Sequence, residues 1–178
     1  MLTIRQIFQK DYPQGKIVSY KYTSNKYYDV SIKKTETSWQ ISLEEEKLAN
    51  PFEKLLEEEI FEDYKNGSEY YIGEWNGQEI AVLVIQQMAW NNTLLIHDLY
   101  VTESFKRNGI GEKLMVVAKK RGSALGVRSI TLETQTSNYP AIQFYLKNGF
   151  ELVGVNTISY TNEDMENKEV RIELAYVY

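Results

Sequence analysis

The hydrophobic period of the sequence changes at Val101, and this change constrains the fold more than any other feature. Before it, the chain has the pattern of three strands joined by the short turns Asn76-Gly77 and Asn91-Asn92; the strands are residues 70–75, 79–90 and 93–101. After it, apolar residues recur at helical spacing from Ile110 to Leu125, and Gly126 ends the helix. The sequence therefore predicts a strand, a glycine-containing loop and an amphipathic helix in succession.

The remaining segments predict further elements on both sides of this unit. Downstream we expect a strand over 128–134, a helix from about Tyr139 to Asn148 with its cap near Asn138, and strands over 151–160 and 169–178. Upstream we expect a hairpin over 16–34 broken at Ser24-Asn25, an extended piece over 39–43 and a helix over 50–63. This order predicts one domain, residues 1–178, built on a mixed sheet with helices on its faces.

Composition excludes several classes of site. The chain has no cysteine and a single histidine, His97, so we expect no disulfide, no Cys nucleophile and no zinc-type metal centre. Composition alone leaves an all-oxygen Mg²⁺ or Ca²⁺ site open. No apolar run reaches signal-peptide or membrane-span length, and a cytoplasmic location is expected. The net charge of −5 disfavours nucleic acid and favours a cationic small-molecule partner; no membrane partner is expected.

The loop Phe105–Gly111 is the strongest candidate for a ligand site. Its glycines let backbone approach a ligand, the following helix offers N–H groups and a positive dipole end, and Lys106 and Arg107 add charge. These properties suit a diphosphate. A dinucleotide fingerprint would need glycine where Leu114 stands, and a P-loop would need Gly-Lys-Ser/Thr, which is absent after Gly111.

The co-linear set HDLYV, FKRNGIG, ITLET, Asn138, Ala141, Phe144, Tyr145 and NGFELVG resembles the GNAT superfamily of N-acetyltransferases, with good cover from Gly73 to Tyr160. The resemblance implies an α/β (α+β) GNAT fold. That fold is a mixed, mostly antiparallel sheet of about seven strands, with helices on both faces and a splay between the fourth and fifth core strands.

The resemblance also implies that acetyl-CoA is the cosubstrate, with no metal. Loop amides would hold its pyrophosphate, and the end of the strand before the loop would pair with pantetheine. The implied cofactor-binding residues are Leu99, Tyr100, Val101, Lys106, Arg107, Asn108, Gly109, Ile110, Gly111, Asn138 and Tyr145. The family more often has Arg or Gln where Lys106 stands, so that one hydrogen bond differs.

Family position makes Tyr145 a candidate general acid, which would protonate the departing CoA thiolate. The acceptor amine must first lose a proton. Glu133 and Asp98 coincide with acidic positions of family members, His97 has the most suitable ordinary pKa, and a water relay would also serve. Because there is no cysteine to carry an acyl group, we expect direct transfer in a ternary complex.

Within the superfamily the C-terminal half resembles the streptothricin acetyltransferases, which act on the β-lysine part of a cationic antibiotic. Candidate substrate-binding residues are Asp29, Glu36, Glu45, Trp39, Trp75, Trp90, His97 and Asp98. A protein N-terminus, a polyamine or a ribosomal-protein lysine are alternative acceptors. A non-catalytic acyl-CoA sensor is the alternative of another class, and the chain is expected to be a monomer or homodimer.

Overall fold

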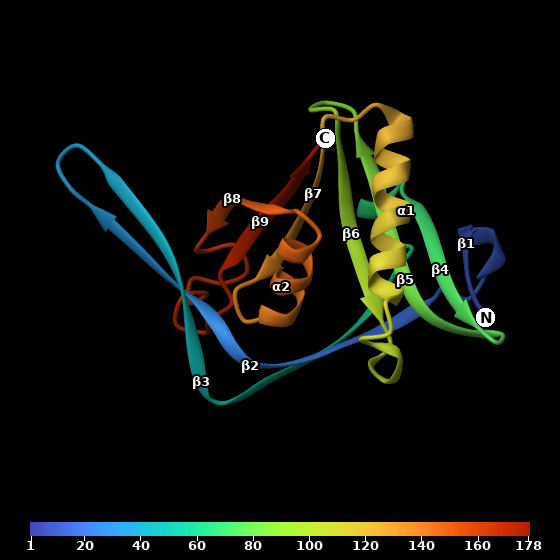
Figure 1. Cartoon of the computed structure of the whole chain (residues 1–178), viewed down its shortest axis with the longest axis horizontal. Helices are drawn as coiled ribbons and strands as arrows, with labels where there is room; N and C mark the ends of the chain where they lie inside the picture. Colours follow the sequence, from blue (N-terminus) through green and yellow to red (C-terminus); the bar gives the residue numbers. More distant parts are fainter. The chain divides into compact units, whose positions relative to one another are not determined.

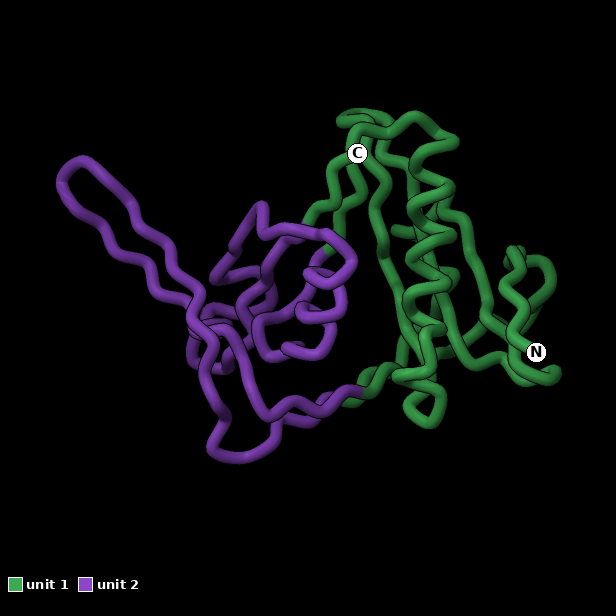
Figure 2. Tube along the Cα trace, in the orientation of Figure 1, with its two compact units in different colours: residues 1–21, 55–132, 175–178 green, residues 22–54, 133–174 purple.

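The computed structural model describes residues 1–178. The chain divides into two compact units, shown in two colours in Figure 2: residues 1–21, 55–132 and 175–178 form the first, and residues 22–54 and 133–174 form the second. Figure 1 labels the helices and strands. The helices are α1 (Ile110–Leu125) and α2 (Tyr139–Lys147), and neither is long and apolar enough to cross a membrane.

Seven strands form the main sheet, in the order β1-β4-β5-β6-β7-β9-β8. The ladders β1–β4, β4–β5 and β5–β6 are antiparallel, and β6–β7 is parallel. The bounds are β1 Leu2–Ile7, β4 Glu69–Trp75, β5 Gln78–Met88, β6 Thr93–Val101, β7 Ser129–Gln135, β8 Glu151–Asn156 and β9 Arg171–Val177. The mixed, mostly antiparallel seven-stranded sheet is thereby confirmed; the splay and the helices on both faces stay predictions.

The first unit packs α1 against β5 and β6. The buried residues of α1 recur at helical spacing, at Ile110, Leu114, Met115, Ala118 and Gly122, so one face of the helix is apolar. A separate core cluster joins β1, β4 and β5 to the two residues that follow β3. It consists of Ile7, Ile60, Phe61, Ile72, Val82 and Val84, with Tyr20 and Tyr100 packed beside it. Three 3₁₀ turns complete the connections: η1 Gln9–Asp11, η2 Asp63–Lys65 and η3 Glu103–Phe105.

A two-stranded ribbon, β2 (Ile17–Lys34) and β3 (Trp39–Glu59), supplies part of the second unit. The ribbon turns at Thr35–Ser38, and this end projects from the rest of that unit in Figure 2. Nearer its middle it contacts α2, because Gln143 donates to the Tyr28 hydroxyl over 2.9 Å and Tyr139 donates to Glu45 over 2.5 Å. These contacts give the middle of the ribbon a partner within its unit.

Two expectations for the N-terminal third are wrong. Strand β2 continues through Ser24-Asn25, where we expected a hairpin turn. Of the segment 50–63 predicted as a helix, residues 50–59 belong to β3 and residue 63 begins η2. The apolar spacing there fits both periods, and pairing with β2 decides between them; Phe52 stacks on Tyr22 with ring centroids 5.9 Å apart. Pro51 is tolerated because each strand of a two-stranded ribbon has an unpaired edge.

Candidate functional site

The loop between β6 and α1 has the backbone of an anion site. Gly109 is the N-cap of α1 and has φ +73°, and a Cβ added there would meet no atom within 4 Å. The left-handed conformation, rather than crowding, therefore explains the glycine. No side chain caps this helix end, so the first N–H groups of α1, at Ile110 and Gly111, point out of the helix without a capping oxygen. Such an end suits a phosphate group.

Lys106 holds this loop against the first residues of β2. Its ammonium donates to the Lys21 carbonyl and to Glu103, both over 2.7 Å, and lies 5.1 Å from the Tyr100 ring centroid. The Tyr100 hydroxyl in turn accepts from the Lys21 N–H over 3.2 Å. The Lys106 charge predicted for a phosphate is thus already hydrogen-bonded within the protein, while Arg107 beside it is exposed.

Asp98 lies in a buried, charged network. Its carboxylate accepts from Lys65 over 2.9 Å and from the Tyr20 hydroxyl over 2.8 Å, and Lys65 and Asp98 are 1% and 7% exposed. Burial raises the pKa of Tyr20, and the charge and hydrogen bond of Asp98 raise it further. Burial lowers the pKa of Lys65, but attraction to Asp98 outweighs this and the pKa is raised. Asp98 thus already has a cationic partner.

His97 is the extra residue of a β-bulge. In the β5–β6 ladder Val84 pairs with Asp98 and Ile85 with Ile96, so His97 has no counterpart on β5. Its Nε2 lies 2.7 Å from Oε1 of Gln86, and its ring centroid lies 6.0 Å from that of Tyr64 in η2. Burial lowers the pKa of His97, the charge of Asp98 opposes this shift, and Lys65 reinforces it. The imidazole is therefore held neutral at pH 7.

Three of the predicted catalytic and cofactor-binding residues lie in the second unit. Tyr145 is on α2, 8% exposed, with its ring centroid 5.4 Å from Phe144 and 5.8 Å from Phe150. Asn138 is the N-cap residue of α2 through its backbone carbonyl, which accepts from Ile142, and its side chain makes no cap bond. Glu133 is exposed and forms an ion pair with Arg171 over 2.5 Å. Tyr145 is thus mostly buried, and Glu133 already has a cationic partner.

Two of the predicted tryptophans, Trp75 and Trp90, lie far apart in the first unit. Trp75 and Trp90 stand before and after β5, whose eleven residues separate them by about 35 Å. Trp39 stands at the turn end of the ribbon, where the Lys34 ammonium lies 5.2 Å from its ring. The ribbon also carries three predicted carboxylates. Glu45 accepts hydrogen bonds from Lys26 and Tyr139, and Asp29 accepts a long one from Tyr27. Glu36 lies in the turn of the ribbon.

Sequence reasoning missed the partners of the β6 residues. Tyr20, Lys65 and Gln86 each bond a predicted site residue, yet each is of an ordinary type in its own segment. Only the long-range pairing of the chain brings them to β6, so no local signal could have found them. No group of three or more His, Asp or Glu side chains is arranged to hold a metal ion.

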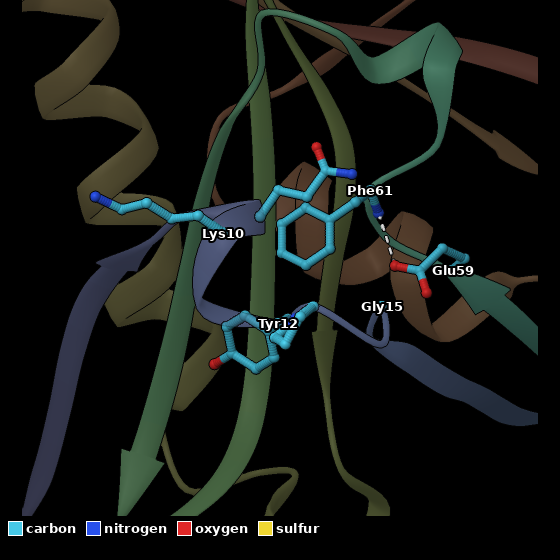
Figure 3. Close-up of a pocket in the computed structure, with 7 residues that line it drawn as sticks. Lys10, Tyr12, Gly15, Glu59 and Phe61 are labelled. Atoms are coloured by element: carbon cyan, nitrogen blue, oxygen red, sulfur yellow. Dashed lines mark hydrogen bonds between the residues drawn. The ribbon is translucent and has the colours of Figure 1, made fainter.

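A pocket of about 460 Å³ in the first unit is separate from these residues (Figure 3). It is lined by Gln9, Lys10, Tyr12, Pro13, Gly15, Glu59 and Phe61. The Glu59 carboxylate accepts from the backbone N–H groups of Phe61 and Lys16, so its negative charge is already satisfied within the chain. None of the predicted site residues lines this pocket.

Comparison with known proteins gives one family. A profile of the acetyltransferase (GNAT) family matches residues 4–150. A streptothricin acetyltransferase from Escherichia coli is 30% identical to this chain over 97 residues, which are 54% of this chain and 56% of that protein. The match therefore spans little more than half the length of that curated relative.

Two solved structures match nearly the whole chain. A Bacillus anthracis protein described as a candidate streptothricin acetyltransferase, in complex with acetyl coenzyme A, is 25% identical; the match has a TM-score of 0.79 and covers 100% of this chain and 98% of that one. A nourseothricin acetyltransferase is 21% identical, with a TM-score of 0.76 and cover of 99% and 98%. The first likeness extends to the ribbon, and the second supports the fold alone.

Proposed function

The chain belongs to the acetyltransferase (GNAT) family, and on this premise we propose that it transfers the acetyl group of acetyl-CoA to a primary amine of a small cationic substrate. The proposed acceptor is the β-lysine moiety of streptothricin. The observation that carries the proposal is the full-length likeness to the Bacillus anthracis structure that holds acetyl coenzyme A. The ribbon β2–β3, which takes up much of the N-terminal third, is included in that likeness.

The residues of the loop fit the diphosphate of acetyl-CoA. The uncapped N-terminus of α1 offers N–H groups and a positive dipole end, and Gly109 keeps the approach open. Arg107 is exposed beside them, while Lys106 is bonded to Lys21 and Glu103. We therefore assign the diphosphate to backbone N–H groups first and give the Lys106 ammonium a supporting role.

Acetyl transfer requires two proton movements. The acceptor ammonium loses one proton to a base, and its lone pair then forms the new N–C bond at the thioester carbonyl. The C–S bond breaks with its electron pair on sulfur, and the second proton passes from nitrogen to sulfur, giving amide and CoA thiol. In the proposal the Tyr145 hydroxyl donates to the sulfur and is reprotonated by the amine, a role worth about 10² to 10⁴ in rate.

The test is acetyl-CoA turnover with four acceptors: streptothricin, an aminoglycoside, spermidine and a peptide with a free N-terminus. We expect the highest kcat/KM with streptothricin, and mass spectrometry should place the acetyl group on its β-lysine amine. A higher kcat/KM with the peptide or with spermidine would show that this amine, and not streptothricin, is the preferred acceptor. Acetyl-CoA binding in calorimetry without turnover of any amine would instead favour a sensor.

Tyr145→Phe keeps the ring and removes the proposed donor. We expect kcat to fall while acetyl-CoA affinity is retained, since the hydroxyl is assigned to the departing sulfur. Unchanged kcat would remove Tyr145 from the proposal without affecting the substrate assignment. A stable acetyl-enzyme in mass spectrometry would contradict direct transfer.

A further inference from the structure

We infer that His97 is the proton acceptor for the substrate amine, through its Nδ1 atom, and that Gln86 is a positioning residue that fixes the imidazole tautomer. The inference rests on the proposed function, because it supplies the base that acetyl transfer needs. It is carried by the hydrogen bonds of Gln86 and by the bulge that sets His97 out of the regular β5–β6 register.

Gln86 can bind His97 in one orientation only. Its Nε2 donates to the Asn66 carbonyl over 2.7 Å, and a carbonyl oxygen can only accept, so the amide nitrogen of Gln86 must face Asn66. Its Oε1 therefore faces Nε2 of His97, 2.7 Å away, and also can only accept. The hydrogen must sit on Nε2. A neutral imidazole carries one N–H, so Nδ1 holds the lone pair that can take up a proton.

The groups around His97 keep this imidazole neutral. From β5 it meets Gln86, from η2 Tyr64 and Lys65, and within β6 Asp98, which is bonded to Tyr20 of β2. The charges of Asp98 and Lys65 oppose each other at the ring, and burial is the largest influence, which lowers the pKa of His97. A neutral histidine at pH 7 is ready to act as a base.

The other two candidates are less suited to this step. Asp98 is bonded to Lys65 and Tyr20 and is buried, so a substrate ammonium would have to displace an internal ammonium. Glu133 is exposed and paired with Arg171. In the proposed step one proton moves from the ammonium to Nδ1, the amine attacks, and the imidazolium later releases the proton to water.

The first test needs no substrate, because His97 is the only histidine of the chain. In the ¹⁵N NMR spectrum of the imidazole we expect the Nε2–H tautomer and a pKa below the ordinary value of 6.5. An Nδ1–H tautomer, or an imidazolium that persists at pH 7, overturns the inference.

Gln86→Glu tests the positioning role. A carboxylate that accepts from Nε2–H stabilises the imidazolium, so we expect the His97 pKa and the acidic limb of the kcat/KM profile to move together to higher pH. The matched control is Gln87→Glu, which adds the same charge at the exposed neighbouring residue and should leave both in place. A shifted pKa with an unmoved acidic limb would show that His97 is not the base.

His97→Gln tests the catalytic role. We expect kcat/KM for the best acceptor to fall by about 10² to 10⁴, with acetyl-CoA affinity in calorimetry unchanged. If the wild-type chain acetylates an amine and His97→Gln stays within about threefold of it, the inference is overturned while the proposed function stands. If the wild type acetylates none of the amines, the proposed function fails and the inference fails with it.

Discussion

Removal of Lys65 should destabilise the protein strongly, because it leaves a buried carboxylate without its cationic partner. Lys65 and Asp98 are 1% and 7% exposed, and after Lys65→Met only the Tyr20 hydroxyl still bonds Asp98. Breaking a buried ion pair from one side costs about 3–5 kcal/mol. At about 2–4 °C per kcal/mol for a chain of this size, the melting temperature should fall by about 6–20 °C.

The assay is urea unfolding at pH 7, followed by circular dichroism, with thermal melting as a second readout. The raised pKa of Lys65 means that its contribution is fully present below the unfolded-state pKa of lysine, about 10.4, and is lost only as pH rises through the folded value. At pH 7 the whole contribution is therefore measured.

Two further variants test whether Lys65 and Asp98 form a desolvated ion pair. Arg5→Met removes ion pairs with Glu74 and Glu79, in which Arg5 is 44% exposed, and should cost about 0–1 kcal/mol for each pair. Lys65→Met/Asp98→Leu removes both charges and should recover part of the loss, because only the unpaired Tyr20 hydroxyl remains, at a cost of about 1–3 kcal/mol. If Lys65→Met cost no more than Arg5→Met, or the double variant were less stable than the single one, the network would not be a desolvated ion pair.

Three other changes have defined outcomes. Gly109→Ala should cost about 1–2 kcal/mol in thermal melting because of its φ of +73°, and should weaken acetyl-CoA in calorimetry, whereas Gly109→Asn should be tolerated better. Burial raises the pKa of Tyr22 to about 12, so the stability that this phenol contributes is present below pH 10 and is lost as pH rises through about 12. In a titration followed by ultraviolet absorbance, Tyr22→Phe should remove one tyrosine that ionises near pH 12. Loss of a tyrosine that ionises near pH 10 would contradict this. Because Glu133 is exposed and paired with Arg171, Glu133→Gln should change the free energy of unfolding by only about 0.2–1 kcal/mol. It should also leave the acidic limb of the kcat/KM profile against pH in place. Disappearance of that limb would show that Glu133 is the base.

The sequence predicted best those elements whose signals are local. The strand 93–101 and the helix 110–125 have the predicted bounds, because the change of period is abrupt and left-handed glycines stand before and after the helix, at Gly109 and Gly126. Helix α2 ends one residue before the predicted end. Each signal lies within a few residues of the boundary that it marks.

The prediction failed where partners far along the chain decide the structure. Residues 50–63 carry apolar side chains at spacings that fit a helix, yet β3 pairs with β2, and Lys54 forms an ion pair with Glu169. Strand β1 has no distinctive pattern of its own and is defined by its ladder with β4. Local propensity is outweighed when pairing of this kind supplies the hydrogen bonds and the packing.

The candidate site was partly hidden for the same reason, and the bulge in β6 shows how. In a regular strand, adjacent side chains point to opposite faces, so the sequence could not predict that His97 and Asp98 both lie against η2. The bulge makes this arrangement, with Tyr64 beside the His97 ring and Lys65 bonded to Asp98. Adjacent residues thereby acquire opposite properties, because Asp98 is bound in an ion pair while the imidazole stays neutral. A neutral imidazole beside a carboxylate that is already bound in an ion pair is an arrangement that suits the proton-acceptor role proposed for His97.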